Sequence, residues 1–261
     1  PENPFFNRDT TSLTAKITAD MDNGMQFTSI TGSLDLNKFY TEDACGGLCF
    51  FPFTTTADYS QWSQEFRFSG ETDASRWQVG AYYLDIDSVT SNQVEGPTIT
   101  GSPLGIVLSD LDITSTNWSV FGQAEFDLSD MFTLIAGLRW SQDDKDLTLI
   151  QTSFNMEDQG IPSGTILFDL AQQAVGPNAD VPIIDYGDYA ARLQLNMHTG
   201  EDTLWFLSWN RGIKGGNWTA AAEVTIDELK NKEEPLNSYE VGVKTSLARR
   251  QASLTATASY Y

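Results

Sequence analysis

Seven charged side chains lie in short alternating segments, each directly beside an apolar residue. They are Glu65, Arg67, Glu125, Arg139, Arg192, Glu240 and Lys244. Side chains that alternate along a strand point to opposite faces, so these groups are expected to line one polar surface. There they could form ionic contacts with a substrate, and the arginines Arg67, Arg139 and Arg192 are the candidate substrate-binding residues. The competing interpretation is structural: charge pairs between strands, or contact with another part of the protein.

A Cys-Gly-Gly-Leu-Cys segment offers a second kind of chemistry. Cys45 and Cys49 enclose two glycines that let a small ring close. We expect an oxidised disulfide, which would contribute on the order of 2 kcal/mol in the loop-entropy picture. Phe50, Phe51 and Phe53 follow directly. Apolar side chains in an exposed loop can form a ligand-contacting ridge, or they can simply pack the loop.

Metal binding and catalysis are not favoured by the composition. Two cysteines and one histidine are too few for a closed zinc site. Acidic residues concentrate outside the strands predicted below, as solvated loops do, and capture of a divalent cation is the alternative. No such run has the spacing of a known calcium loop, so we expect no bound metal. We also expect no cofactor and no enzymatic activity. These acidic residues are Asp110, Asp112, Asp143, Asp144, Asp146, Glu157, Asp158, Asp185 and Asp188.

Charge and hydropathy exclude two further classes of protein. A net charge of -21 argues against a nucleic-acid partner, whose phosphates require lysine and arginine. Hydrophobic residues make up 40% of the chain and aromatic residues 12%. Even so, no apolar run approaches the length of a membrane-spanning helix.

The clearest element is a hairpin over residues 118–140. Its first arm places Trp118, Val120 and Phe126 on one face, and its second arm places Phe132 and Trp140 on one face, with polar residues opposite. This two-residue period predicts two strands. Eight steps between the aromatic ends correspond to about 20 Å of height at a 40° tilt, which matches an apolar band between aromatic girdles. The pattern therefore predicts a lipid-facing outside and a wet inside.

The same pattern recurs along the chain and predicts about ten antiparallel strands in a meander. Short turns alternate with long connections, as in outer-membrane barrels with short periplasmic turns and long outer loops. A soluble antiparallel β protein is the alternative, but long structureless loops are uncommon in compact domains. The predicted strands lie near 12–19, 25–36, 61–70, 76–87, 117–128, 132–144, 188–197, 203–211, 236–247 and 251–261, and the long loops near 37–60, 88–116, 145–187 and 212–235.

Trp218 follows Gly215-Gly216-Asn217 near the outer end of one of these strands. It is a further possible aromatic contact for a ligand. The competing interpretation is a tryptophan anchored at the membrane interface.

Several segments resemble successive barrel motifs of TonB-dependent outer-membrane receptors, in order and spacing over nearly the whole chain. The resemblance rests on residues 62–70 (WSQEFRFSG), 121–130 (FGQAEFDLSD), 136–140 (AGLRW) with 143–145 (DDK), 209–217 (WNRGIKGGN) and 236–244 (LNSYEVGVK). It implies a 22-stranded barrel with an N-terminal plug and a TonB box. Such a receptor imports iron-siderophore complexes or other scarce nutrients at the expense of the proton-motive force.

The resemblance also sets the expected domain organisation and surroundings. Residues 1–261 would be the central part of the barrel domain, without the plug, the TonB box and the final strands. The expected partners are outer-membrane lipid and lipopolysaccharide, the TonB complex through the plug, and a ferric siderophore or other nutrient, at the outer membrane of a Gram-negative bacterium. A passive porin is the first alternative. A ten-stranded outer-membrane hydrolase is the second, but the sole histidine, His198, lies in a predicted periplasmic turn, away from the outer mouth.

Overall fold

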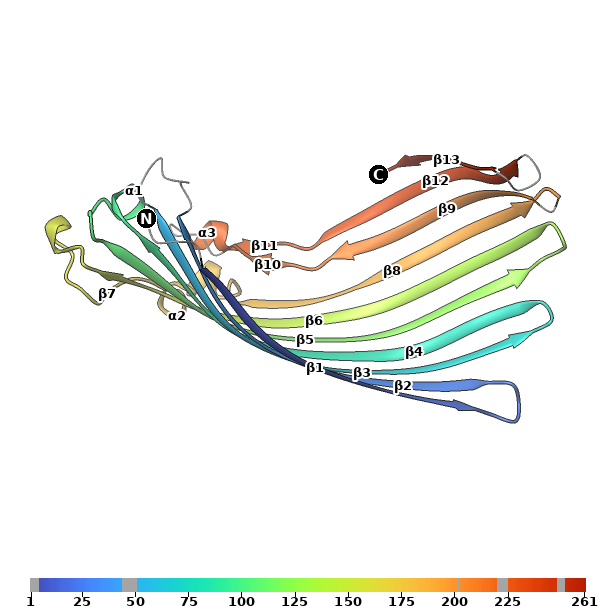
Figure 1. Cartoon of the computed structure of the whole chain (residues 1–261), viewed down its shortest axis with the longest axis horizontal. Coiled ribbons are helices and arrows are strands. Elements are labelled where there is room, and N and C mark those ends of the chain that lie inside the picture. Colours follow the sequence, from blue (N-terminus) through green and yellow to red (C-terminus); the bar gives the residue numbers. More distant parts are fainter. Residues whose placement is uncertain (1–4, 44–50, 201, 220–224, 248–251) are drawn as a thin grey trace.

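Ten long strands form one antiparallel sheet. The computed structural model describes residues 5–43, 51–200, 202–219, 225–247 and 252–261. Each strand pairs with the next along the chain, which confirms the predicted meander, and the short turns gather at one end of the sheet (Figure 1). In sheet order the strands are β1 (Phe5–Asp20), β2 (Gln26–Asp43), β3 (Pro52–Thr72), β4 (Ser75–Glu95), β5 (Ile106–Asp127), β6 (Phe132–Phe154), β8 (Ile183–His198), β9 (Thr203–Lys214), β12 (Glu234–Leu247) and β13 (Ala252–Tyr260).

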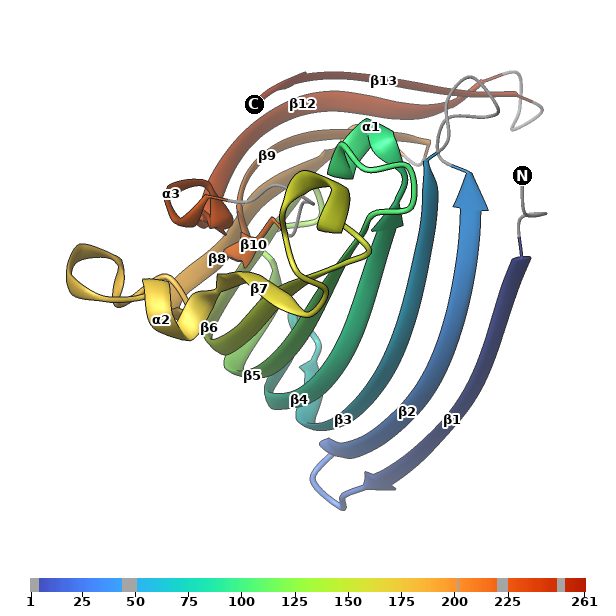
Figure 2. The same ribbon diagram turned by 90° about the vertical axis from the view of Figure 1, so that its left-hand side faces the viewer.

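The sheet is curved into an arc that the chain does not close. Figure 2 looks along the strands from the end with the long connections and shows the arc running from β1 to β13. Within the described residues these two strands form the edges, because each pairs with one neighbour only. The chain therefore builds one section of a barrel wall.

Nine of the ten strands run further toward the long connections than their sequence pattern predicted. The connections there cover only 44–51, 96–105, 155–182 and 215–233, so the long loops predicted at 37–60, 88–116, 145–187 and 212–235 were wrong in extent. The reason differs between strands. In the extensions of β5 and β6, apolar residues such as Leu111 and Leu149 lie on the face opposite to that of Trp118 and Trp140. In β3, polar residues occupy both faces at Thr54-Thr55-Thr56. Apolar alternation stops there while backbone pairing continues, and Thr54 Oγ1 donates a 3.1 Å hydrogen bond to Thr41 Oγ1 across the strands.

The register confirms which residues of the central hairpin share a face. Val120 lies opposite Trp140 and Phe126 opposite Leu134, so the apolar sides of β5 and β6 coincide. Val120 and Leu138 are 49% and 59% exposed, whereas Ser119 on the other face is 1% exposed. We call the exposed apolar side the outer face and the opposite side the inner face.

A row of aromatic residues crosses the outer face diagonally. Tyr83 lies opposite Trp118, whereas Trp118 lies opposite Gln142, two residues beyond Trp140. The row is thus level between some neighbouring strands and steps toward the short turns between others, as expected when strands tilt against the axis of a barrel. We call this row the aromatic belt, formed by Trp62, Tyr83, Trp118, Trp140, Tyr189, Trp209 and Tyr239.

Short elements fold over the ends of the strands that extend beyond this belt. Figure 2 shows α1 and β10 on the concave side of the arc, which is the inner face. No helix in the described ranges is long and apolar enough to cross a membrane. These elements are α1 (Pro97–Thr100), η1 (Glu157–Gln159), β7 (Thr165–Asp169), α2 (Leu170–Gln173), η2 (Gly176–Asn178), β10 (Asn217–Trp218), α3 (Ile226–Leu229) and β11 (Lys230–Asn231).

Candidate functional site

An apolar cluster at the outer end of the inner face fixes the two longest connections. Leu149 of β6 and Leu229 of α3 are fully buried in it, although they are far apart in sequence. Leu149 and Arg139 lie on the same face of β6. The two connections therefore cover the inner face, which carries charged residues nearer the short turns. We call this cluster the loop core, formed by Leu111, Leu147, Leu149, Phe168, Leu170, Val181, Ile184, Trp218 and Leu229.

Trp218 is part of the loop core. Its side chain is 8% exposed, and its indole Nε1 donates a 2.6 Å hydrogen bond to the carbonyl oxygen of Val181. The sequence predicted Trp218 as a possible ligand contact or as an interface tryptophan, and the structure packs its indole within the loop core. Its role in ligand contact stays a prediction. The other residues of the loop core come from six other elements and the 174–182 connection, so local sequence gave no signal for the burial.

Phe51 and Phe53 pack beside a second, smaller apolar cluster. Phe53 belongs to β3, not to a loop as predicted, and pairs with Val94 of β4. Val94 forms the buried cluster with Val107 and Met156, and both phenylalanines are half-buried against it. Each ring therefore keeps part of its surface open at the outer end. Phe50, Cys45 and Cys49 lie outside the described residues.

Three of the predicted charged residues, Glu65, Arg67 and Glu125, are already paired. Arg67 forms an ion pair with Glu65 on the same strand. Glu125 accepts from Arg76, with 3.3 Å between the Arg76 guanidinium and Glu125 Oε2, and Arg76 also reaches Asp127 at 3.4 Å. For these residues the structural interpretation, charge pairs on the barrel wall, describes the geometry.

Lys244 and Glu240 occupy inner positions on β12. The Lys244 ammonium lies 5.6 Å from the centroid of the Phe206 ring, within the range of a cation–π contact. Glu240 lies opposite Ser208 of β9. Both residues thus face the same inner surface as predicted.

The two remaining arginines meet in a hollow on the inner face. The hollow has a volume of about 370 Å³ and is lined by β4, β5, β6, β8 and β9. Arg139 and Arg192 project from neighbouring strands, because Arg139 lies opposite Ala190 and Arg192 opposite Gly137. We call this cavity the arginine hollow.

Arg211, which had no predicted role, also lines the arginine hollow. Its guanidinium binds both carboxylate oxygens of Asp188, at 3.0 and 2.5 Å, and its central carbon lies 4.1 Å from the centroid of the Tyr189 ring. The backbone pairing of β8 with β9 ends at Ala191 and Arg211, so this ion pair bridges the strands where they separate. The predicted strand ended at Arg211, and only the side-chain contacts in the structure reveal its partner.

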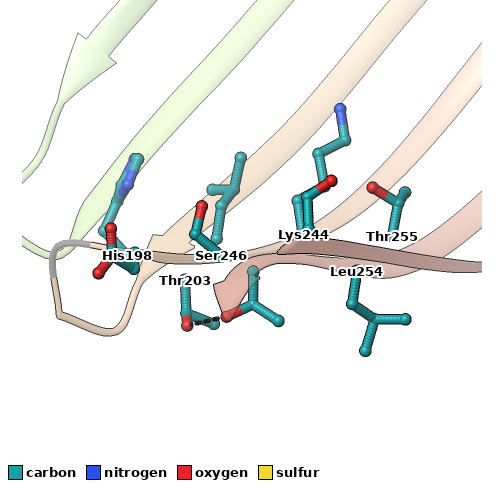
Figure 3. A pocket seen from close by; sticks show the side chains of 10 residues that line it. His198, Thr203, Lys244, Ser246, Leu254 and Thr255 are labelled. Atoms are coloured by element: carbon teal, nitrogen blue, oxygen red, sulfur yellow. Dashed lines mark hydrogen bonds between the residues drawn. The ribbon is translucent and has the colours of Figure 1, made fainter. Parts of the chain in front are cut away.

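A second hollow, of about 380 Å³, lies at the short-turn end (Figure 3). His198 lies there, at the end predicted from the turn lengths. His198 and Lys244 project to one side of the sheet, whereas Thr203 and Leu254 project to the other. The hollow therefore wraps around both faces instead of forming one enclosed site. Among the described residues no group of three or more His, Cys, Asp or Glu side chains is arranged to hold a metal ion.

Comparison with known proteins places this arrangement in a family. The family model described as "TonB dependent receptor-like, beta-barrel" matches residues 1–261. A search of curated proteins finds no match.

Solved structures with a similar fold are much longer chains. The ferric yersiniabactin uptake receptor FyuA from Yersinia pestis has a TM-score of 0.75 and 16% identity, with 98% of this chain and 36% of that chain covered. The ferric-catecholate import receptor Fiu from E. coli K12 has a TM-score of 0.67 and 10% identity, with 99% and 41% covered. The copper transporter OprC has a TM-score of 0.64 and 10% identity, with 93% and 38% covered. At these identities the likeness concerns the fold, and the chain spans about two fifths of each relative.

Proposed function

The chain belongs to the TonB-dependent receptor-like β-barrel family, and on that premise we propose that it is the central wall section of an outer-membrane receptor that binds a scarce nutrient and imports it with TonB energy. The complete barrel would have 22 strands, an N-terminal plug and a TonB box. Its lipid-facing belt would contact the outer-membrane lipid and lipopolysaccharide of a Gram-negative bacterium.

One observation carries this proposal. A single curved sheet presents aromatic and aliphatic side chains on its convex side, whereas its concave side carries charged groups and a hollow. A lipid-exposed wall must satisfy its backbone hydrogen bonds between strands and place its charged side chains inside, and strands β4 to β6 follow this pattern below the aromatic belt. A wall with polar inner groups suits passage of a hydrophilic solute.

A ferric siderophore is the preferred nutrient. FyuA is named as a ferric yersiniabactin uptake receptor and Fiu as a ferric-catecholate import receptor, and both have a similar fold. OprC is named as a copper transporter, so the fold alone also fits other metals. We propose Phe50, Phe51 and Phe53 as contacts at the outer mouth, where two of these rings are half-buried and half-open. Arg67, Arg139 and Arg192 are proposed as contacts along the wall.

Energy-dependent uptake by the full-length receptor tests the proposal. Iron-starved cells that carry the receptor should accumulate iron-55 from a ferric siderophore, and should lose that uptake without TonB or after a protonophore. Uptake that persists in de-energised cells, together with leakage of unrelated small solutes, would favour a passive porin instead.

The aromatic mouth contacts have their own test. Replacing Phe50, Phe51 and Phe53 together with Ser removes apolar area that could contribute several kcal/mol to ligand binding. We expect weaker uptake at limiting substrate with normal heat-modifiable migration, which reports a folded barrel. Unchanged uptake would show that these rings only pack the outer end.

A further inference from the structure

Among the described residues, Arg139 and Arg192 have no carboxylate partner, unlike several other arginines of the sheet. Arg67, Arg76 and Arg211 each form an ion pair, but within the described part of the chain neither Arg139 nor Arg192 does. The two are diagonal neighbours on β6 and β8, a position in which Cβ atoms are typically about 7–8 Å apart. Like charges on neighbouring strands repel each other, and an anion bound in the hollow that both arginines line would relieve this repulsion.

Both guanidinium groups are held by neutral neighbours. Arg139 Nε donates a 3.1 Å hydrogen bond to Ser141 Oγ, and its guanidinium lies 5.6 Å from the centroid of the Tyr82 ring and 5.8 Å from that of Phe121. Arg192 donates a 2.5 Å hydrogen bond to Gln194 Oε1. These contacts orient the groups without neutralising them, so both keep their full charge and donors for a ligand.

The space between the two arginines is formed by small residues. Gly137 lies opposite Arg192, and Ala190 lies opposite Arg139. No large side chain from these two positions fills the hollow, which leaves room above the strand backbone for a bound group.

The rest of the lining supplies donors and no acid. Side-chain amides of Gln78, Gln123 and Asn210 line the arginine hollow, and no aspartate or glutamate does. The contrast with the whole chain is large, since its 36 acidic residues outnumber its 15 lysines and arginines. A lining that excludes acid in so acidic a protein points to an anionic ligand.

We propose that the arginine hollow binds carboxylate groups of a solute. Guanidinium groups bind carboxylates through short charge-assisted hydrogen bonds, often in pairs. Arg139 immediately precedes Trp140 of the aromatic belt, and Arg192 lies three residues beyond Tyr189 toward the short turns. The hollow therefore lies on the short-turn side of the aromatic belt, apart from the aromatic mouth contacts. It serves as an intermediate binding site for an anionic solute inside the barrel. Only this transport role rests on the proposed function.

Equilibrium dialysis of the purified full-length receptor tests the site without any energy source. The probe is radiolabelled propane-1,2,3-tricarboxylate, which lacks the hydroxyl with which citrate chelates iron. We expect saturable binding that weakens with salt, and no binding of the neutral triamide. The double variant Arg139→Gln/Arg192→Gln should weaken binding at least tenfold, and Arg192→Lys, which keeps the charge but loses the planar fork, should weaken it less.

The matched control is Arg76→Gln, which removes an inner positive charge that already has carboxylate partners. It should leave tricarboxylate binding within twofold of wild type. The proposal is overturned if the wild type does not bind the tricarboxylate, if the double variant binds as well as wild type, or if Arg76→Gln is equally damaging. Heat-modifiable migration checks folding. If the double variant does not fold, the single variant Arg192→Lys replaces it, and binding as tight as that of wild type then overturns the proposal. Because binding and uptake are measured separately, loss of one does not decide the other.

Discussion

A graded series of arginine substitutions on the outer face of β6 measures how deep each position lies in the membrane. Ala136 is four residues from both Phe132 and Trp140, which the sequence places at the two edges of the apolar band. At about 3.3 Å per residue and a tilt of about 40°, four residues correspond to about 10 Å of depth. Leu138 lies about 5 Å below the belt by the same estimate, and Asp144 about 10 Å beyond it.

The expected cost follows this depth. Arginine at the bilayer midplane of a barrel costs about 2–4 kcal/mol, and the cost falls to about 0–1 kcal/mol near the interface. Ala136→Arg should therefore lower the equilibrium constant for folding into liposomes by roughly 30- to 700-fold, since 1.4 kcal/mol is a factor of ten. Leu138→Arg should have a smaller effect, and Asp144→Arg almost none.

The assay is a urea titration of the full-length receptor in liposomes, read by heat-modifiable migration. Ala136→Ser controls for the loss of an apolar side chain without a charge. The inner-face control is Ser63→Arg, which adds the same charge to β3 on the face of Glu65, away from the arginine hollow. Equal damage from Ser63→Arg and Ala136→Arg would refute the assignment of faces, and a flat series would refute the depth argument.

Two further predictions concern the outer end. A cysteine replacing the exposed Gln173 of α2 should react with a membrane-impermeant thiol reagent on intact cells, whereas one replacing Asn23 in a short turn should not, and the reverse pattern would invert the proposed orientation. Leu149→Ala removes a fully buried side chain and should destabilise the loop core by about 2–5 kcal/mol. Faster proteolysis within 155–182 would report this, and Ile166→Ala, at an exposed position, should show no such change.

The sequence was informative where one face of a strand meets an apolar environment. Alternation predicted both arms of the central hairpin because Val120 and Trp140 must lie on the same side. It was less informative for β2, where Ile30 lies opposite Glu65 and therefore on the inner face. Periodicity alone identifies two faces of a strand, and the partner strand decides which of them is inside.

The candidate site could be predicted only in part, because its geometry depends on contacts distant in sequence. Arg139 and Arg192 were found from their apolar neighbours, but their separation from carboxylates and their common hollow follow from the pairing of β6 with β8. Arg211 was missed because its partner, Asp188, is 23 residues away on another strand. The burial of Trp218 likewise depends on residues from distant elements.

Strands β8 and β9 are not paired beyond Ala191 and Arg211. Side chains and close backbone contacts therefore hold the outer ends of these strands together. Lys145 Nζ donates a 2.9 Å hydrogen bond to the carbonyl oxygen of Gly216, and a Cβ added at Gly216 would lie 2.9 Å from the carbonyl oxygen of Asn231 in β11. That oxygen belongs to the backbone and cannot yield without moving β11.

Gly216→Ala should therefore loosen the 215–233 connection while leaving the barrel folded. We expect faster proteolysis in this connection with unchanged heat-modifiable migration. Gly212→Ala is the matched control, because an added Cβ there meets no atom within 4 Å. Equal proteolysis of the two variants would show that close packing at Gly216 does not hold the connection, and that the Arg211–Asp188 ion pair and the loop core suffice.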